Sequence, residues 1–103
     1  MFASIRKYHS VISIDELKHR VDKGFVPLLN EHTGFLGFFL IESPGSQGRN
    51  VCTTVSLFDS LDAAIESNEK AKKFVKESLS ELLPEPPEII SGEVILNILN
   101  ARR

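Results

Sequence analysis

The chain has 103 residues, 42% of them hydrophobic, and we expect a single domain over residues 1–103. Twelve basic and fourteen acidic residues give a formal net charge of -2 without forming a basic stripe, so no nucleic acid partner is expected. No apolar run approaches the roughly 20 residues that span a bilayer, and the N-terminal stretch alternates instead of showing a signal peptide's apolar region. We therefore expect a cytoplasmic protein with no membrane partner.

The first third of the chain predicts a strand followed by a helix. Residues 2–9 alternate in polarity and contain aromatic and β-branched side chains, which is typical of a strand. Ser13 and Glu16 form a capping box, so a helix is expected to begin directly after Ser13. Gly24 and Pro27 predict a break or kink in this helix, followed by one short turn, because proline has no N–H to donate.

Two further strands are predicted in the middle of the chain. They are GFLGFFLIE at residues 34–42 and VCTTVSLF at residues 51–58. Residues 43–50 between them contain two glycines and a proline, which is the composition of a long hairpin loop.

A long helix and a last strand follow. Asp59 or Ser60 is expected to cap the helix, and Pro84 is expected to end it. The apolar residues predicted to share its buried stripe are Leu61, Ala64, Ile65, Ala71, Val75, Leu79 and Leu82. Residues 88–99 predict a fourth strand, and residues 100–103 a polar tail that frays.

This order of elements, βαββαβ, predicts an α+β fold of the ferredoxin-like type, a four-stranded antiparallel sheet with two helices on one face. The strand at 34–42 carries large apolar side chains on both faces. Phe35, Phe39 and Ile41 are expected on one side, and Leu36, Phe38 and Leu40 on the other. Since two helices cover only one face, we predict that a second copy covers the other and that the protein is a homodimer.

GFLGFFLI also resembles the aromatic signature of RNA-recognition domains, which share this order of elements. That signature belongs on the third strand, whereas here it lies on the second and follows Thr33 instead of a basic residue. With an acidic chain as well, we interpret these aromatic residues as core.

Asn68 is the most informative polar residue. It falls near the middle of the apolar stripe of the second helix, so it should point at the sheet. A buried amide costs about 1–3 kcal/mol unless it is hydrogen-bonded, either within the protein or to a ligand, and both alternatives stay open. Ala64 and Ala71 beside it leave room for a ligand. Ser67, at the edge of the stripe, is interpreted first as an incidental helix serine, with ligand contact as the alternative.

The first strand places Ser4, Arg6 and Tyr8 on one face, together with Phe2. An arginine in the middle of a strand covered on both sides needs a carboxylate, a carbonyl or a ligand. We favour a structural partner for Arg6, with Glu93 as the candidate, over a ligand. The ring of Tyr8 suits the core, while its hydroxyl could reach a ligand or a proton-transfer chain.

Nucleophile and metal chemistry receive little support. Cys52, the only cysteine, is predicted to be a small buried hydrophobic residue rather than a nucleophile. His9, His19 and His32 do not have the spacing of metal ligands, so no metal is expected.

Two segments carry a family resemblance: PLLNEHTGFLGFF at residues 27–39 and LFDSLDAAIESNEKAKKFV at residues 57–75. With the order of strands, they make the chain resemble the dimeric α+β barrel superfamily, specifically small bacterial proteins similar to antibiotic biosynthesis monooxygenases. The resemblance implies that two ferredoxin-like sheets pack into a barrel with the helices outside, in agreement with the predicted homodimer. Haem-degrading members have a tryptophan, an asparagine on the first strand and a histidine in the second helix; this chain has none of these.

The resemblance therefore implies a cofactor-independent monooxygenase-like protein that acts on a small hydrophobic aromatic compound, a phenol or quinol. In that scheme Asn68 binds the substrate's oxygens or a peroxide, Arg6 stabilises a phenolate or enolate, and Tyr8 relays a proton. Ser67, Ser4 and Phe39 are predicted to contact the ligand. The alternative is a non-catalytic small-ligand-binding or stress-response module that uses the same pocket.

Overall fold

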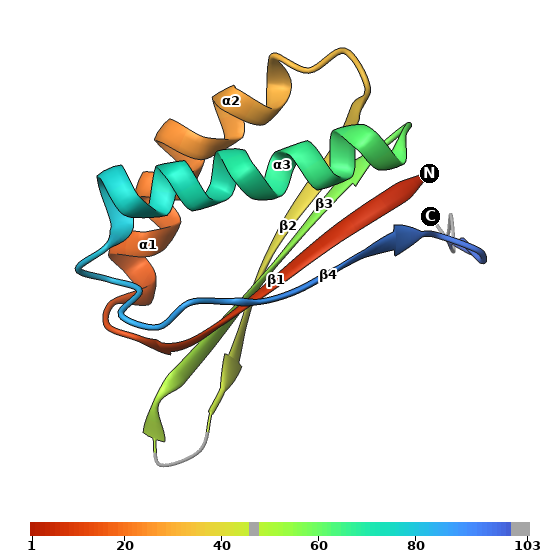
Figure 1. Ribbon diagram of the computed structural model, residues 1–103. Helices are drawn as coiled ribbons and strands as arrows, with labels where there is room; N and C mark the ends of the chain where they lie inside the picture. Colours follow the sequence, from red (N-terminus) through yellow and green to blue (C-terminus); the bar gives the residue numbers. More distant parts are fainter. Residues whose placement is uncertain (46–47, 100–103) are drawn as a thin grey trace, which may run out of the picture.

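The computed structural model describes residues 1–45 and 48–99. Its elements are β1 (Phe2–Val11), α1 (Ile14–Arg20), the π-helical turn η1 (Val21–Phe25), α2 (Val26–Asn30), β2 (Phe35–Pro44), β3 (Asn50–Phe58), α3 (Leu61–Phe74), the π-helical turn η3 (Val75–Leu79) and β4 (Glu88–Glu93). The four strands form one antiparallel sheet in the order β2-β3-β1-β4, and all the helices lie on one of its faces (Figure 1). This is the predicted ferredoxin-like α+β fold. Residues 46–47 of the predicted loop and the predicted tail 100–103 lie outside the described residues.

The first helix begins and bends where the sequence predicts. The Ser13 hydroxyl accepts a hydrogen bond from the backbone N–H of Glu16 at 3.3 Å. The helix does not end at Pro27 but passes through η1, so that the proline lies in the first turn of α2, where a missing N–H costs little. Gly24 allows close packing against α3, because a Cβ at this position would lie 2.7 Å from the ring of Phe74.

The predicted stripe of the second helix is buried at Ala64, Ala71, Leu79 and Leu82, but not at its start. Ser60 caps the helix, accepting from the N–H of Ala63 at 3.2 Å. The predicted core residues Leu61 and Ile65 are 41% and 49% exposed, and the side chains that α3 buries are small: Ala63, Ala64, Ser67 and Ala71. Small side chains let the helix approach the polar centre of the sheet closely, which a stripe of leucines would prevent.

The faces of β2 also differ from the prediction at its start. The register with β3 shifts between Phe35 and Gly37, which indicates a β-bulge. Past this bulge the alternation reverses, so that Phe35 packs against the core with Phe38, while Leu36 is exposed on the other face with Phe39. The prediction that Phe35 shares a face with Phe39 is therefore wrong, because strict alternation does not anticipate a bulge.

The last strand is shorter than predicted. β4 ends at Glu93, which pairs with Phe2, the first residue of β1, and one more hydrogen bond joins the Val94 N–H to the Met1 carbonyl at 2.9 Å. Beyond this point no strand of the described residues pairs with β4, so the prediction of a strand to residue 99 is wrong. The apolar side chains after it are all exposed: Ile95, Leu96, Ile98 and Leu99.

The face of the sheet away from the helices carries one apolar row that crosses all four strands. Ile90, Ile5, Val55 and Phe39 are register partners from β4 through β1 and β3 to β2. We call this row, together with Leu36 and Ile41, the open face. Phe39 and Ile90 are 56% and 69% exposed. The predicted sheet with two apolar faces is thus present in the single chain.

The described residues offer neither a membrane span nor a metal centre. None of their helices is long and apolar enough to cross a bilayer. They bring no three His, Cys, Asp or Glu side chains together as metal ligands. A cytoplasmic location stays a prediction.

Candidate ligand-binding and active site

The candidate site lies where the helix-facing side of the sheet meets α3. Alternation along β1 places Ser4, Arg6 and Tyr8 on one face, as predicted. The structure shows that this face is the one toward the helices, and all three residues are buried. The register places Thr54 beside Arg6 and Ser56 beside Ser4 on β3. A cluster of polar side chains therefore lies in the middle of an otherwise apolar layer.

Arg6 is the centre of this cluster and is only 1% exposed. Its Nε donates to Thr54 Oγ1 at 3.1 Å, and its Nη2 donates to Ser56 Oγ at 2.6 Å. Its Nη1 donates to Asn68 Oδ1 at 2.8 Å and to Ser67 Oγ at 3.3 Å. These bonds use four of the five guanidinium N–H groups, which leaves one on Nη2. The strands and α3 thus hold the guanidinium in one orientation.

Every hydrogen-bond acceptor around Arg6 is electrically neutral. The predicted partner Glu93 is exposed and pairs through its backbone with Phe2 at the end of the sheet, so that prediction is wrong. No ion pair among the described residues involves Arg6; the ring of Phe25 lies under the guanidinium at 5.6 Å. Burial lowers the pKa of Arg6 below its ordinary value. A buried cation without a counterion costs several kcal/mol, so this centre favours an anion in contact with it.

Asn68 connects α3 to the cluster through both ends of its amide. Its Oδ1 accepts from Arg6 and from the Ser4 hydroxyl, and its Nδ2 donates to Ser91 Oγ on β4 at 3.0 Å. Ser4 and Ser91 are themselves hydrogen-bonded at 2.8 Å. The two lone pairs of Oδ1 are therefore occupied, and one Nδ2 hydrogen remains for a ligand. Asn68 holds Arg6 in place and can offer a ligand one donor.

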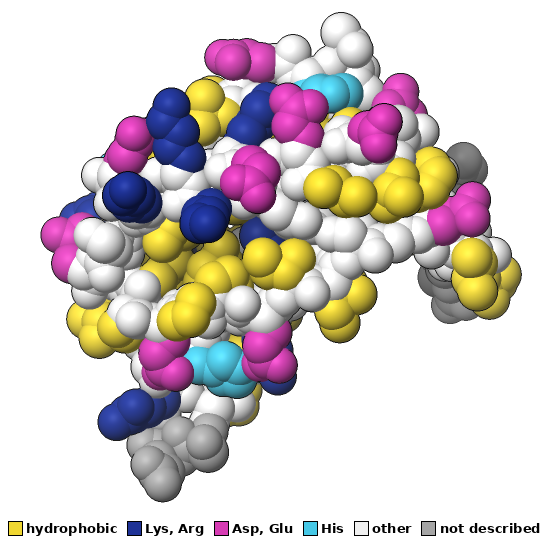
Figure 2. All heavy atoms as spheres, viewed as in Figure 1, with side chains coloured by type: hydrophobic (Ala, Val, Ile, Leu, Met, Phe, Trp, Pro, Cys, Tyr) yellow, Lys and Arg dark blue, Asp and Glu magenta, His cyan; other side chains and the backbone are white. Residues whose placement is uncertain are grey.

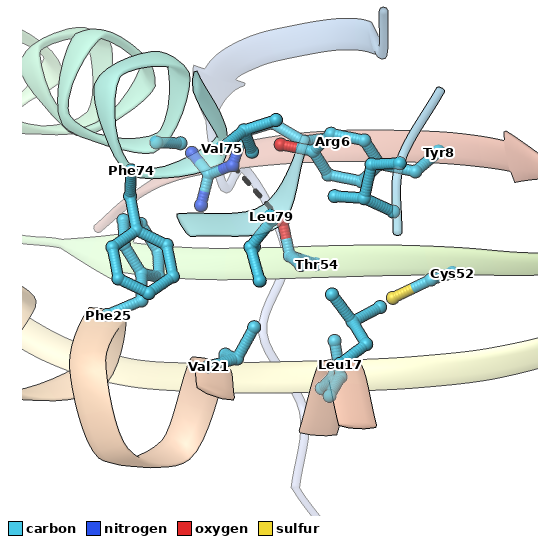
Figure 3. Close-up of a pocket in the computed structure, with 13 residues that line it drawn as sticks. Arg6, Tyr8, Leu17, Val21, Phe25, Cys52, Thr54, Phe74, Val75 and Leu79 are labelled. Atoms are coloured by element: carbon cyan, nitrogen blue, oxygen red, sulfur yellow. Dashed lines mark hydrogen bonds between the residues drawn. The ribbon is translucent and has the colours of Figure 1, made fainter. Parts of the chain in front are cut away.

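Tyr8 supplies the second functional group. Figure 3 shows its hydroxyl end turned toward the Arg6 guanidinium. Burial raises the pKa of Tyr8, and the charge of Arg6 opposes this shift. None of the hydrogen bonds between side chains of the described residues involves the Tyr8 hydroxyl. Tyr8 is therefore a neutral phenol at ordinary pH, with its proton available to a ligand.

Two hollows meet at Arg6 and Tyr8. The inner pocket, drawn in Figure 3, lies between the first helix and β3 and has a volume of about 20 Å³, the space of one water molecule. The outer cleft lies between α3 and the segment leading to β4, and has a volume of about 430 Å³. Asn68, Ala71, Val75, Pro87 and Ile89 line the outer cleft together with Arg6 and Tyr8. A small aromatic molecule fits the outer cleft, whereas the inner pocket would have to open to admit one.

The structure brings together five of the six residues predicted for the site. Asn68, Arg6 and Tyr8 line the outer cleft; Ser4 and Ser67 are buried behind it. The Ser67 hydroxyl donates to the Ala64 carbonyl at 2.6 Å and accepts from Arg6. The Ser4 hydroxyl donates to Asn68, and neither serine lines the cleft. Phe39 is a correction: it lies on the open face, because its neighbour Phe38 occupies the helix side of β2.

Three members of the cluster were not predicted: Thr54, Ser56 and Ser91. They lie on β3 and β4 opposite Arg6 and Ser4, and Ser56 is completely buried. The available signal was the run of hydroxyl residues in VCTTVSLF, whose alternation places Thr54 and Ser56 on the same face.

Cys52 lies on the same side of the sheet and is fully buried. Burial, with a smaller contribution from Glu42, raises the pKa of its thiol to about 11. The thiol is therefore protonated at neutral pH. This agrees with the prediction of a buried hydrophobic residue.

No protein-family model matches the sequence, and a search of curated proteins gives no match. Solved structures do match. A monooxygenase from the gene ActVA-Orf6 of Streptomyces coelicolor, in complex with nanaomycin D, is 20% identical with a TM-score of 0.63, over 97% of this chain and 92% of that one. SnoaB, a cofactor-independent oxygenase from Streptomyces nogalater, is 10% identical with a TM-score of 0.66, over 96% and 98%. NE2512 from Nitrosomonas europaea, a protein of unknown function, is 16% identical with a TM-score of 0.68, over 98% and 95%.

These likenesses extend over nearly the whole chain at low sequence identity, so they establish the fold. The chain therefore has a ferredoxin-like α+β fold. The structures that it matches also include a putative antibiotic biosynthesis monooxygenase from Nitrosomonas europaea. The resemblance predicted from residues 27–39 and 57–75 is confirmed at the level of the fold.

Proposed function

We propose that this protein is a homodimeric, cofactor-independent monooxygenase-like enzyme whose substrate is a small hydrophobic phenol or quinol bound in the outer cleft. The observation that carries the proposal is the buried charge of Arg6, which has no counterion among the described residues and lies beside a neutral tyrosine at the base of a largely apolar cleft. Two structurally similar proteins, an oxygenase without cofactor and a monooxygenase holding nanaomycin D, support the same class of reaction.

The chemistry begins with ionisation of the substrate. A phenol that places its oxygen against the free N–H of Arg6 ionises more easily, because the guanidinium charge stabilises the anion in a site of low dielectric constant. The electron-rich anion then reduces O₂ directly. Of the two oxygen atoms, one becomes a new ring carbonyl and the other leaves as water, so the phenol is oxidised to a quinone. The phenolic O–H and the ring C–H that is replaced supply the two hydrogens of the water, and the substrate supplies all four electrons.

The protein's own groups have separate tasks in this scheme. Arg6 holds the negative charge, while Tyr8 donates and recovers a proton at the substrate oxygen or at a peroxide intermediate. Asn68 fixes Arg6 and offers its remaining Nδ2 hydrogen to the oxygen species. No separate cofactor is needed, because the substrate supplies the electrons.

The homodimer is proposed from the open face and from the segment after β4. The row Ile90, Ile5, Val55 and Phe39 exposes a continuous apolar surface, which isolated soluble domains seldom leave bare. The exposed apolar side chains at residues 95–99 continue from the same sheet. A second copy, face to face about a two-fold axis, covers both. A monodisperse species of about 11.5 kDa in sedimentation would contradict this assembly.

Tyr8→Phe provides the sharpest test of catalysis, because the loss of a hydroxyl without a hydrogen bond to another described side chain should leave the fold intact. Oxygen consumption is measured with an anthrone and a naphthohydroquinone, each corrected for its autoxidation without protein. We expect wild type to accelerate consumption and Tyr8→Phe to lose about 100-fold of that acceleration while still binding the compound. Equal rates in the two proteins would remove Tyr8 from the mechanism.

A second candidate function is a non-catalytic small-ligand-binding module that uses the same cleft. The observation favouring it is that the acceptor atom of Asn68 is fully engaged within the protein, so that residue has a structural task. Binding of the anthrone by calorimetry, without any acceleration of oxygen consumption by wild type, would establish this module and rule out the enzyme. If no compound of this class binds, both functions fail.

A further inference from the structure

The outer cleft contains two lysines in addition to Arg6, the only positive charge that the proposed reaction uses. Its charged lining residues are Arg6, Lys72 and Lys76 against a single acidic residue, Glu69. The whole chain has a formal charge of -2, so the positive character is local to the cleft. Neither lysine takes part in an ion pair among the described residues. Their charges are therefore available to a ligand.

The cations are arranged along one wall. Asn68, Lys72 and Lys76 follow at intervals of four residues along α3 and η3, so they share one face of the helix. At 1.5 Å per residue, Lys72 lies about 6 Å and Lys76 about 12 Å along the axis from Asn68, which contacts Arg6. A second anionic group on the ligand would thus lie about 6–12 Å from the group bound at Arg6.

The opposite wall of the cleft is apolar. It is formed by Pro86, Pro87 and Ile89, and the two prolines have no N–H to donate. Figure 2 shows the hydrophobic surface between α3 and the segment before β4, with basic side chains on the α3 side. A flat aromatic molecule could lie on the proline wall and direct polar groups only toward the helix.

From this arrangement we infer that the cleft selects aromatic hydroxy acids: ring systems with an ionisable hydroxyl bound at Arg6 and a carboxylate at the remote end, bound by Lys72 and Lys76. The inference rests on the proposed function, since it takes Arg6 as the site of the hydroxyl. The separation of about 6–12 Å corresponds to two or three fused rings. A phenol without the carboxylate leaves both lysines without a partner.

The test compares three ligands on the full chain by titration calorimetry. They are a hydroxynaphthoic acid with its carboxylate on the ring remote from the hydroxyl, the corresponding amide, and the naphthol that lacks either group. We expect the acid to bind about tenfold more tightly than the amide, and the preference to shrink as salt is added. Equal affinity of acid and amide would overturn the inference.

The lysines are tested with a matched pair of double variants. Lys72→Gln with Lys76→Gln should reduce the preference for the acid to about twofold or less and leave naphthol binding unchanged. Lys70→Gln with Lys73→Gln removes the same charge from the same helix, but these lysines line a different hollow, together with Glu31 and Glu77. This control should keep the preference. A preference that survives in the first variant, or is lost equally in the control, contradicts the inference.

Oxygen consumption on the same samples separates the two proposals. A preference for the acid that depends on Lys72 and Lys76, without oxygen consumption, supports the ligand class and contradicts the enzyme. Oxygen consumption with equal rates for acid and amide at low concentration supports the enzyme and contradicts the ligand class.

Discussion

Both faces of the sheet carry apolar side chains, but the centres of the two faces differ. The face covered by helices carries Arg6 and its ring of serine, threonine and asparagine partners, whereas the open face carries isoleucine, valine and phenylalanine. Ordinarily the covered face is the apolar one. Polar groups placed where water is excluded indicate a site for a ligand, and apolar groups left in water indicate a surface for assembly. This difference is the reason for proposing a ligand site on the covered face and a dimer interface on the open face.

The largest effect on stability should come from the covered face. Phe25 is buried against Phe38, Phe74 and the Arg6 guanidinium, so Phe25→Ala should lower the free energy of unfolding by about 3–5 kcal/mol. Urea denaturation should give this loss at every protein concentration. Phe39→Ala on the open face is the control, and its loss should depend on protein concentration, because it arises from the dimer. If the loss of unfolding free energy in Phe39→Ala did not depend on protein concentration, the open face would belong to the core of the single chain.

A charge on the open face should separate the two copies. Phe39→Lys introduces a charge into the proposed interface and should weaken dimerisation at least about 100-fold, or roughly 3 kcal/mol. Ile65→Lys, which adds the same charge to an exposed position of α3, should leave the dimer intact. Sedimentation of both variants gives the result, with circular dichroism to verify the fold. A Phe39→Lys protein that remains dimeric would move the interface elsewhere.

Loss of the hydrogen bond between Asn68 and Arg6 should have an effect of intermediate size on the free energy of unfolding. Asn68→Ala leaves an N–H of the buried Arg6 unsatisfied and should cost about 1–3 kcal/mol of unfolding free energy. In an Arg6→Met background the same change should cost less by about 1 kcal/mol, because the group that needed the amide is gone. Urea denaturation of wild type, the two single variants and the double variant gives the four free energies of this double-mutant cycle. Additive losses would show that Asn68 acts independently of Arg6.

The smallest expected effect is a shift in the titration of Tyr8 at high pH. Tyr8 is the sole tyrosine and the chain has no tryptophan, so phenolate absorbance reports on this residue alone. Burial raises the pKa of Tyr8, while Arg6 lowers it, so Arg6→Met should raise it further. The pKa of Tyr8 is higher in the folded protein than in the unfolded chain. The buried phenol therefore contributes fully to the free energy of unfolding below the pKa of the unfolded chain, and this contribution is lost as pH rises through the pKa of the folded protein. Burial of Cys52 acts in the same direction, up to a pKa of about 11. A Tyr8 titration at or below the ordinary value would contradict the buried phenol.

Local patterns were sufficient for most of the fold. The Ser13 cap, the bend near Pro27 and the alternation of β1 depend on neighbours in the sequence, and the structure has all three. The errors depend on distant partners. The face of Phe35 is set by a bulge against β3, and the end of β4 is set by where β1 begins.

The candidate site could be predicted only in part. Arg6, Tyr8 and Asn68 were recognisable because each is polar at a position that the pattern buries. Their partners Thr54, Ser56 and Ser91 were not, since small hydroxyl residues are common in strands and acquire meaning only beside a buried guanidinium.

The sequence by itself determined the order of elements, the dual apolar character of the sheet and the presence of an arginine, a tyrosine and an asparagine toward its centre. Periodicity carries this information, because burial acts on each element separately. Only the tertiary structure decided that neutral acceptors, not Glu93, surround Arg6, and that the cleft beside it opens along Lys72 and Lys76. The hydrogen bonds of Arg6 join residues 48 to 62 positions apart, and such pairings follow from register and packing, which no local pattern contains.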